Sequence, residues 1–528
     1  MSLLLRNITL SIEQGEEELQ QELCRRFNLP EESIHSLRIV RKGVDARQRR
    51  NIKLVYSVEF AVADEERFFA LHGGNDLLRS PPKLPVEFPQ IRSSARIVVV
   101  GAGPAGLFAA LRLSDHGLTP LLIERGRPVA ERVKDVQGFW SRGELSGESN
   151  VQFGEGGAGT FSDGKLTTRV RDVNHGYVID RLIEFGAPPE VALLAKPHIG
   201  TDRLREVVTS LRRYLEARGV EVRFGHCLTD LQLQEGKLTS VELNGNQQIP
   251  CDMLILAPGH SARDTYRLLD RRGIALEQKP FAMGVRVEHP QELINRIQYG
   301  IPSHPRLPPA DYAVTYNDAA TGRGAYSFCM CPGGVVIGSA SEAGGVVTNG
   351  MSSHLRNAPW ANSALVVSVG PADFPGKHPL AGVEFQRRWE EAAFQAGGGG
   401  FIAPAQSLMS FIGRNGGDSL PSTYSPGVRE CDLATTLPEA VTSVLRRGIL
   451  HFDRLMHGFI SPSAMLVGVE TRTSAPLRIL RGDDCQAVRS SGLYPTGEGA
   501  GYAGGIMSAA LDGIRVADAV AKRLQHHP

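Results

Sequence analysis

One segment of the chain, residues 96–125, joins an apolar strand, a glycine turn, an apolar helix and a second strand: RIVVVGAGPAGLFAALRLSDHGLTPLLIER. This order makes one complete βαβ unit. Gly101, Gly103 and Gly106 match the pattern G-x-G-x-x-G, in which the first glycine makes the tight turn, the second lets backbone approach a pyrophosphate, and the third lets the helix pack closely. The segment therefore predicts a parallel α/β domain with a dinucleotide at the N-terminus of the helix.

The second strand of this unit ends in an acid. Glu124 follows the glycine turn at about the 20-residue offset at which a carboxylate accepts hydrogen bonds from a ribose 2′-hydroxyl. An acid here favours FAD or NAD over NADP, because it would repel the 2′-phosphate of NADP. We assign to the same cofactor site Arg125, beside the acid, and Pro104 and Ala105 at the start of the helix.

The glycine pattern occurs twice more in the chain. The match that begins at Gly154 is followed by TFSDGKLTT rather than by an apolar helix. The match that begins at Gly499 has a strand and a helix, but no further strand that could supply a ribose acid. Only the first match has the full βαβ context, so we predict the dinucleotide site there; a strand-to-helix turn without a ligand is the alternative.

The remaining periodicity predicts a Rossmann-like domain that is interrupted by a strand-rich α+β substrate or cap domain and preceded by a small α+β domain. Pro81, Pro82, Pro85 and Pro89 mark a semi-rigid linker. The expected division is 1–75 for the small N-terminal domain, 76–93 for the linker, 94–280 and 481–528 for the two parts of the cofactor domain, and 281–480 for the cap.

Composition excludes several classes of protein. The seven scattered cysteines do not form the dense framework of a disulfide-stapled secreted domain, and the N-terminus lacks the features of a signal peptide. No stretch reaches the roughly 18 apolar residues of a membrane-spanning helix. We therefore expect a cytoplasmic protein without a membrane partner and without a metal site. The sequence indicates no oligomeric state.

The overall charge gives no reason to expect nucleic acid as a partner, since 58 Lys and Arg balance 57 Asp and Glu. The N-terminal domain nevertheless carries a local basic segment without the aromatic residues that stack on bases. Its members are Arg38, Arg41, Lys42, Arg47, Arg49, Arg50 and Lys53. Nucleic acid is an unlikely partner, and RNA recognition through this segment is the alternative function.

Three further motifs resemble those of the glutathione-reductase-like flavoprotein superfamily. TGEGAGYAGGIMSAALDG resembles its second flavin-contact motif, which implies that Glu498 binds the ribitol. CDMLILAPGH and VEVRFGHCL resemble the strand ends beside the flavin and the adenine. The positions that the resemblance assigns to FAD are Gly497, Gly504, Gly505, Ile506, Ala257, Pro258, Gly259, Cys227 and Leu228.

More narrowly, NVQFGEGGAGTFSDGKLTTR, AYSFCMCPGG and RKGVDARQ resemble an uncharacterised bacterial family of FAD-dependent dehydrogenases over essentially the whole chain. The resemblance implies FAD and a redox role, but it does not identify a substrate. We expect the FAD to be bound noncovalently, because the sequence gives no evidence of a residue for covalent attachment, and we expect hydride transfer with a small or medium substrate. The reductant is either that substrate or NAD(P)H that visits the flavin transiently.

The same motifs contain residues that could act on a substrate. Gly157 and Gly159 could wrap the flavin, with Lys165 as a cation near its reactive face; a mobile glycine loop is the alternative. Cys329 and Cys331 lie two apart in an expected strand, so both should project to one face. They could form a redox pair or a site for a soft ligand, but packing residues are the preferred interpretation.

Two further candidates are weaker. Arg286 and Glu288 alternate on another expected strand, where they could pair with each other or hold a polar substrate. His260 follows Gly259 and could donate a proton. We assign no catalytic residue.

Overall fold

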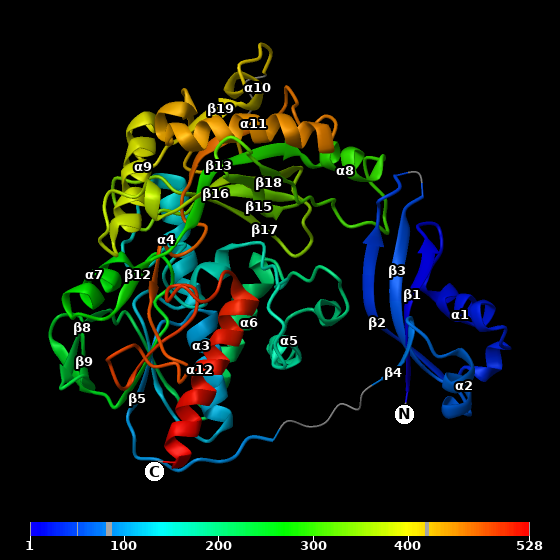
Figure 1. Ribbon diagram of the computed structural model, residues 1–528, viewed down its shortest axis with the longest axis horizontal. Coiled ribbons are helices and arrows are strands. Elements are labelled where there is room, and N and C mark those ends of the chain that lie inside the picture. Colours follow the sequence, from blue (N-terminus) through cyan, green and yellow to red (C-terminus); the bar gives the residue numbers. More distant parts are fainter. Residues whose placement is uncertain (1, 50, 81–86, 418–421, 527–528) are drawn as a thin grey trace.

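The βαβ segment forms the centre of a five-stranded parallel sheet (Figure 1). The computed structural model describes residues 2–49, 51–80, 87–417 and 422–526. The order β23-β11-β5-β6-β7 places the last strand of the chain beside strands that precede the cap. The strands are β5 (Ile97–Val100), β6 (Leu121–Glu124), β7 (Glu221–Phe224), β11 (Met253–Leu256) and β23 (Leu493–Pro495).

Two helices of this part of the chain pack on each other although they are far apart in sequence. α3 (Pro104–Asp115) is apolar on nearly all sides and is buried from Ala105 onward, as expected for a helix inside a protein. It packs against α12 (Ile506–His526), the helix after β23. Further helices of this part are α4 (Val129–Arg142), α5 (His175–Glu184), α6 (Thr201–Ala217) and α7 (Arg263–Arg271).

A second, seven-stranded mixed sheet lies above the parallel sheet in Figure 1, in the order β14-β15-β18-β13-β21-β19-β20. Its strands are β13 (Phe281–Pro290), β14 (Thr315–Asn317), β15 (Gly324–Cys331), β18 (Trp360–Val369), β19 (Ala403–Ser407), β20 (Val428–Glu430) and β21 (Met465–Glu470). Its helices are α8 (Gln291–Tyr299), α9 (Ala381–Gly397), α10 (Leu408–Phe411) and α11 (Glu439–Leu455).

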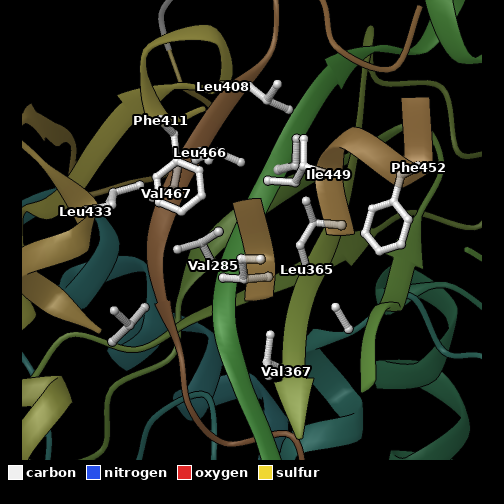
Figure 2. Close-up of a cluster of buried hydrophobic side chains, with 14 of the residues drawn as sticks. Val285, Leu365, Val367, Leu408, Phe411, Leu433, Ile449, Phe452, Leu466 and Val467 are labelled. Atoms are coloured by element: carbon white, nitrogen blue, oxygen red, sulfur yellow. The ribbon is translucent and has the colours of Figure 1, made fainter. Parts of the chain in front are cut away.

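Side chains along β13 and β18 point alternately to the two faces of this sheet, and the two faces differ in character. Val285, Leu365 and Val367 point to one face, where Ile449 and Phe452 of α11 cover them (Figure 2). Each such side chain contributes about 1.5–3 kcal/mol when fully buried. The other face carries smaller and polar residues, and it is the face turned toward the parallel sheet.

The N-terminal part forms its own four-stranded sheet in the order β2-β3-β1-β4. Its elements are β1 (Leu3–Ser11), α1 (Leu19–Phe27), β2 (Ser36–Asp45), β3 (Lys53–Ala61), α2 (Glu65–His72) and β4 (Leu77–Arg79). The first four elements follow the order strand, helix, strand and strand, as suits the small α+β domain expected from the sequence. This sheet touches the rest of the chain where the N–H of Lys42 donates to the carbonyl of Leu193 at 2.7 Å.

Smaller elements complete the chain. Three antiparallel strands follow β7, and two further pairs of strands lie near the cap. They are β8 (Leu228–Gln234), β9 (Lys237–Leu243), β10 (Gln247–Pro250), β12 (Leu276–Gln278), β22 (Leu477–Ile479), β16 (Gly334–Gly338) and β17 (Thr348–Ser352). Short 3-10 turns span Glu16–Glu18, Glu31–Ser33, Gly157–Phe161, Pro189–Ala192, Pro371–Asp373 and Leu433–Thr436.

The predicted fold class is confirmed: a Rossmann-like parallel sheet, a strand-rich insertion and a small α+β unit before them. Pro81, Pro82 and Pro85 of the expected linker lie outside the described residues. No helix among the described residues has the length and apolar character needed to cross a membrane.

Candidate functional site

The turns after β5, β11 and β23 meet at the carboxyl edge of the parallel sheet, where open α/β sheets bind ligands. Gly101 has a φ of 99°, and a Cβ there would lie 2.2 Å from the carbonyl oxygen of Ala257. A Cβ at Gly106 would lie 1.8 Å from the carbonyl oxygen of Gly101. Both positions therefore need glycine for the packing of the turn itself.

Gly103 differs from these two glycines. Its φ of −80° suits any residue, and a Cβ there would meet only the Cα of Gly157, at 3.7 Å. The fold alone thus does not require glycine at this position. A cradle that a Cβ would fill, at the N-terminus of α3, fits the close approach of a pyrophosphate.

Glu124 is buried and binds the loops around the turn. Its carboxylate accepts hydrogen bonds from the N–H groups of Ala102 (2.8 Å), Gly126 (2.9 Å) and Gly154 (2.9 Å). Because a carboxylate has about four acceptor positions, one remains on Oε2 for a ribose hydroxyl. Glu124 therefore organises the loops of the cradle and keeps one acceptor position unused.

Arg125 and Cys227 lie together beyond the end of β6. Arg125 pairs with Asp264 at 2.9 Å and stacks on the ring of Phe153, while the thiol of Cys227 lies 3.8 Å from the carboxylate of Asp264. The side chain of Leu228 is buried in the core and not in this group. The N–H of Cys227 already donates to the side chain of Asn244, so it is not free to contact adenine in this arrangement.

The C-terminal glycine motif packs against the first glycine turn. A Cβ at Gly497 would lie 2.7 Å from the Cβ of Ala105, and one at Gly499 would lie 2.4 Å from the carbonyl oxygen of Gly259. Between Ala257 and Gly259, Pro258 is half-buried. The structure thus brings both glycine motifs and the strand end at Ala257 to one place.

Sequence reasoning missed the residue that holds this motif. Asp512, on α12, is buried; it accepts hydrogen bonds from the N–H of Gly497 at 2.8 Å and from the hydroxyl of Thr496 at 2.9 Å. It also pairs with Arg481 at 2.6 Å. No local pattern identifies this partnership, because Asp512 lies in an ordinary helical segment, ALDG.

The end of the motif leaves open backbone at the start of α12. A Cβ at Gly504 or Gly505 would meet nothing within 4 Å, and Gly505 has a φ of 130°. Ile506, the first residue of α12, lies beside Gly159, where a Cβ would come within 2.9 Å of its side chain. Open glycine backbone before a helix N-terminus suits a flat, anionic group such as the edge of a reduced flavin.

A cavity of about 380 Å³ lies next to this open backbone. It runs from Ala503 and Gly504 to the polar face of the cap sheet, where Tyr326 and Phe328 of β15 line it. Lys279, Phe281, Ser368 and Thr473 complete much of its wall. A mixed polar and aromatic lining of this size suits a small or medium molecule.

Glu498 belongs to the C-terminal glycine motif and lies near Lys279, which lines the cavity. Among the described residues no group donates a hydrogen bond to the Glu498 carboxylate, although this residue is half-buried. Burial raises the pKa of Glu498 to about 7, opposed by the nearby cation of Lys279 and assisted by Cys329. A half-buried acceptor without a partner, between the glycine motif and the cavity, fits a ribitol hydroxyl.

Lys165 lies in a buried cluster rather than alone in a loop. Its ammonium is 2.7 Å from the carboxylate of Asp163 and 4.0 Å from Sγ of Cys331. Asp163 also pairs with Arg356. Burial would raise the pKa of Asp163, but the cations of Lys165 and Arg356 hold it well below its ordinary value.

The expectation for Cys329 and Cys331 needs a correction. The strand does not alternate regularly there, because the register against β18 shifts between Phe328 and Cys331 and Cys329 has a φ of 45°. A bulge therefore sets the direction of the two thiols. Cys329 is partly exposed, whereas Cys331 is fully buried.

The expected pairing of Arg286 with Glu288 is wrong. Arg286 is fully buried and pairs with Glu470 of β21 at 2.6 Å, while Glu288 accepts hydrogen bonds from Ser422 and Thr423. Because they alternate on the strand, the two side chains share one face, but each finds its partners in a different neighbouring segment.

His260, the candidate for proton transfer, is neutral at pH 7. Burial and the cations of Arg472 and Arg263 lower the pKa of His260 to about 4.

Carboxylates partly neutralise the basic segment of the N-terminal part. Arg38 pairs with Glu59, Lys42 with Glu16, and Arg47 with Asp45. Arg50 lies outside the described residues. No observation at this segment favours nucleic acid over ordinary surface ion pairs.

Three family models match parts of the chain. Residues 280–473 match the model described as the C-terminal domain-like part of an FAD-dependent protein, and residues 99–137 match a Rossmann-like NAD(P)-binding domain. Residues 3–61 match a domain of unknown function. The matched segments contain most of the cap, the glycine turn, and strands β1, β2 and β3 of the N-terminal sheet.

Individual proteins are also similar to this chain. An uncharacterized protein from Clostridium beijerinckii is 45% identical over 533 residues, which cover 99% of each chain. The digeranylgeranylglycerophospholipid reductase of Methanocaldococcus jannaschii is 33% identical over 91 residues, 16% of this chain and 23% of its own. The solved structure of the flavin-dependent brominase Bmp2 aligns with a TM-score of 0.36 and 13% identity, over 82% of this chain and 79% of its own.

Proposed function

Because the chain belongs to a family of FAD-dependent proteins, which it shares with the relative from Clostridium beijerinckii over nearly its whole length, we propose that it is an FAD-dependent oxidoreductase of the dehydrogenase type. FAD is its cofactor. In this proposal a hydride passes between a small or medium substrate and noncovalently bound FAD, which supplies the two-electron chemistry when bound.

The proposed cofactor contacts follow the carboxyl edge of the parallel sheet. Gly103 and the N-terminus of α3 bind the pyrophosphate, and Glu124 binds the adenosine ribose through its remaining acceptor position. Glu498 accepts from the ribitol. The other positions that we propose around the cofactor are Gly101, Pro104, Ala105, Gly106, Arg125, Gly157, Gly159, Cys227, Ala257, Pro258, Gly259, Gly497, Gly504, Gly505 and Ile506.

The observation that carries the proposal is the cavity beside Gly504. Its walls come from the C-terminal glycine motif and from the cap sheet, so a molecule inside it would lie between the proposed flavin position and Tyr326. The N-terminus of α12 would stabilise negative charge at that edge. Lys279 can orient an anionic group of the substrate, and the aromatic rings of Tyr326 and Phe328 exclude water.

The domain division supports the same arrangement. We propose that the cap is inserted between two parts of the cofactor domain, with boundaries near residues 280 and 480. The chain crosses between the parts close to β12 and β22, and these short strands pair with each other. Because the two connecting segments pair with each other, they would hold the cap over the edge of the parallel sheet where we propose that the cofactor binds.

The electron source is part of the proposal. Within the described residues only one sheet has the parallel dinucleotide-binding order, so FAD and a permanently bound NAD(P) would compete for it. We propose that the reductant is either the substrate or NAD(P)H that visits the flavin transiently.

The experiment is anaerobic mixing of the yellow purified protein with candidate reductants, followed by the flavin absorbance. Bleaching by one substrate class or by NAD(P)H, with recovery on reoxidation, is the expected result. Colourless protein that FAD cannot reconstitute would overturn the proposal. Flavin that no two-electron donor bleaches, although dithionite does, would overturn the dehydrogenase type while leaving FAD binding intact.

A further inference from the structure

The proposed oxidoreductase function leaves the thiol pair of β15 without a role. Cys329 lies next to Phe328, which lines the cavity, and close enough to Glu498 to influence the pKa of that carboxyl. The pair therefore lies at the same edge as the proposed flavin position. Its surroundings differ from those of packing cysteines in three ways.

The first difference is backbone geometry. Two residues of β15, Cys329 and Met330, lie opposite the single residue Ser363 of β18, and Cys329 adopts a φ of 45°, which is unusual for any residue except glycine. Arg286 fixes this bulge by donating to the carbonyl oxygen of Cys329 at 3.1 Å. The thiol of Cys331 donates to the carbonyl oxygen of Cys329 at 3.3 Å, so the side chain of Cys331 lies against the bulge.

The second difference is charge. The ammonium of Lys165 lies 4.0 Å from Sγ of Cys331, and the guanidinium of Arg286 donates to the carbonyl oxygen of Cys329. The interaction with the Cys331 thiol, together with these cations, holds the pKa of Cys329 below its ordinary value against the effect of burial. The interaction with Cys329, together with burial, raises the pKa of Cys331.

The third difference is exposure. Cys329 is partly exposed, whereas Cys331 is fully buried. An accessible thiolate beside a buried thiol is the arrangement in which one cysteine attacks and the second resolves. No cluster of three or more metal-binding side chains occurs among the described residues, which argues against a closed zinc site here.

We propose that Cys329 and Cys331 form a redox-active dithiol that reacts with disulfides, with Cys329 as the attacking residue and Cys331 as the resolving residue. The thiolate of Cys329 attacks one sulfur of R–S–S–R; the new Sγ–S bond forms, the R–S–S–R bond breaks, and R–S⁻ leaves. Cys331 then gives its proton to R–S⁻ and attacks Sγ of Cys329, which releases the second R–S⁻. The dithiol is oxidised to a disulfide, and the external disulfide is reduced to one thiol and one thiolate.

The experiment uses the reduced, FAD-containing protein and oxidised glutathione as the probe. Alkylation and peptide mass mapping should find a Cys329–Cys331 disulfide in the natural sequence. In Cys331→Ser the glutathione should remain attached to Cys329, because nothing resolves it. In Cys329→Ser the reaction at Cys331 should be slower by at least about tenfold, because a buried thiol of raised pKa reacts poorly.

Cys431 provides the matched control. It is also partly exposed, but burial and the neighbouring Asp432 raise the pKa of its thiol. Cys431→Ser should therefore leave the disulfide and its rate unchanged. If a variant does not fold, peptide mass mapping of the protein with the natural sequence still shows whether the Cys329–Cys331 disulfide forms.

Two results would overturn the proposal. One is glutathione that labels Cys431 while Cys329 and Cys331 remain free thiols. The other is a Cys331→Ser protein whose Cys329 is labelled no faster than Cys431. Flavin absorbance, recorded in the same samples, reports on FAD binding separately, so a failure of the thiol reaction is distinguishable from a failure of the proposed function.

Discussion

A methyl group on Gly103 would lie 3.7 Å from the Cα of Gly157, an ordinary van der Waals contact. The loop that carries Gly157 therefore covers the glycine turn without filling the space at Gly103. Gly101 and Gly106, in contrast, would collide with backbone oxygens if they carried a side chain. The turn thus contains two glycines that the fold requires and one that, in our proposal, the cofactor requires.

The first prediction is that Gly103→Ala keeps the fold and loses FAD. The methyl group fits the protein but occupies the proposed pyrophosphate position, so FAD affinity should fall by more than about tenfold, or 1.4 kcal/mol. The measurement is FAD titration of the apoprotein by fluorescence quenching, with circular dichroism as the check on folding. Gly106→Ala should instead disrupt the fold.

Gly176→Ala is the matched control. This glycine lies in the first turn of α5, where an added Cβ meets nothing within 4 Å. The change should leave FAD affinity as it is and stabilise the helix by roughly 0.5–1 kcal/mol. A Gly103→Ala protein that binds FAD as tightly as this control would show that the pyrophosphate lies elsewhere.

The second prediction concerns Glu498 as an acceptor for the cofactor. Glu498→Ala should weaken FAD binding by roughly 1.5–3 kcal/mol, the range for a hydrogen bond to a charged group. Glu498→Gln keeps an acceptor oxygen and should lose less, and Glu498→Asp should retain FAD. The measurement is again apoprotein titration. Unchanged affinity in the Ala protein would mean that the C-terminal motif does not contact the ribitol.

Local sequence patterns were sufficient to predict the parallel sheet, because the signals of a βαβ unit lie within about 30 residues. Gly101 and Gly106 could be read as required glycines from the same pattern. The order of motifs also predicted that the C-terminal segment returns to this sheet, and β23 does pair with β11. The strand-rich character of the insertion followed from its loss of helical periodicity.

The partners of buried charges could not be predicted, because they depend on contacts between distant segments. Arg286 was expected beside Glu288, two residues away, but pairs with Glu470, 184 residues away. The bulge at Cys329 likewise arises from the register against β18, which the sequence of β15 does not contain. Regular alternation predicted that both cysteines project to one face, whereas the bulge sets the direction of their side chains.

The third prediction follows from Asp512, which joins α12 to the glycine motif. Asp512→Ala leaves the buried guanidinium of Arg481 without its carboxylate and removes the acceptor for the N–H of Gly497. Removal of one partner of a buried ion pair costs about 3–5 kcal/mol. Urea denaturation should show this loss, and Asp512→Asn should show a smaller one. The exposed Asp484→Asn should stay within about 0.5 kcal/mol.

The fourth prediction concerns the buried pair of Arg286 and Glu470. Arg286→Met leaves Glu470 buried with the hydroxyl of Thr348 as a remaining donor, so it should destabilise the protein by about 3–5 kcal/mol. The additional change Glu470→Leu should recover part of the loss, since it removes the unpaired charge. Arg323→Met, in a more exposed pair with Asp373, should cost about 1 kcal/mol or less. Equal losses for the two single changes would contradict the argument.

The fifth prediction is that Glu498 makes the FAD-free protein less stable as the pH rises through the mildly acidic range. Its pKa is about 7 in the folded protein, against 4.5 for the ordinary carboxyl group, so the folded protein binds this proton more tightly than the unfolded chain does. The free energy of unfolding must then fall as the pH rises from 4.5 to 7, and level off where both states are ionised.

A shift of one pKa unit changes the free energy of unfolding by about 1.4 kcal/mol. Partial exposure of Glu498 reduces this effect, so the free energy of unfolding should fall by about 1–3 kcal/mol. Other groups titrate in the same range, and the test is therefore the difference between the natural sequence and Glu498→Gln, measured by urea denaturation at several pH values. The difference should grow with pH in favour of the Gln protein. Lys279→Met removes the cation that opposes the shift and should move the fall to higher pH. A difference that is constant from pH 4.5 to pH 7 would show that the Glu498 carboxylate is well solvated in the apoprotein.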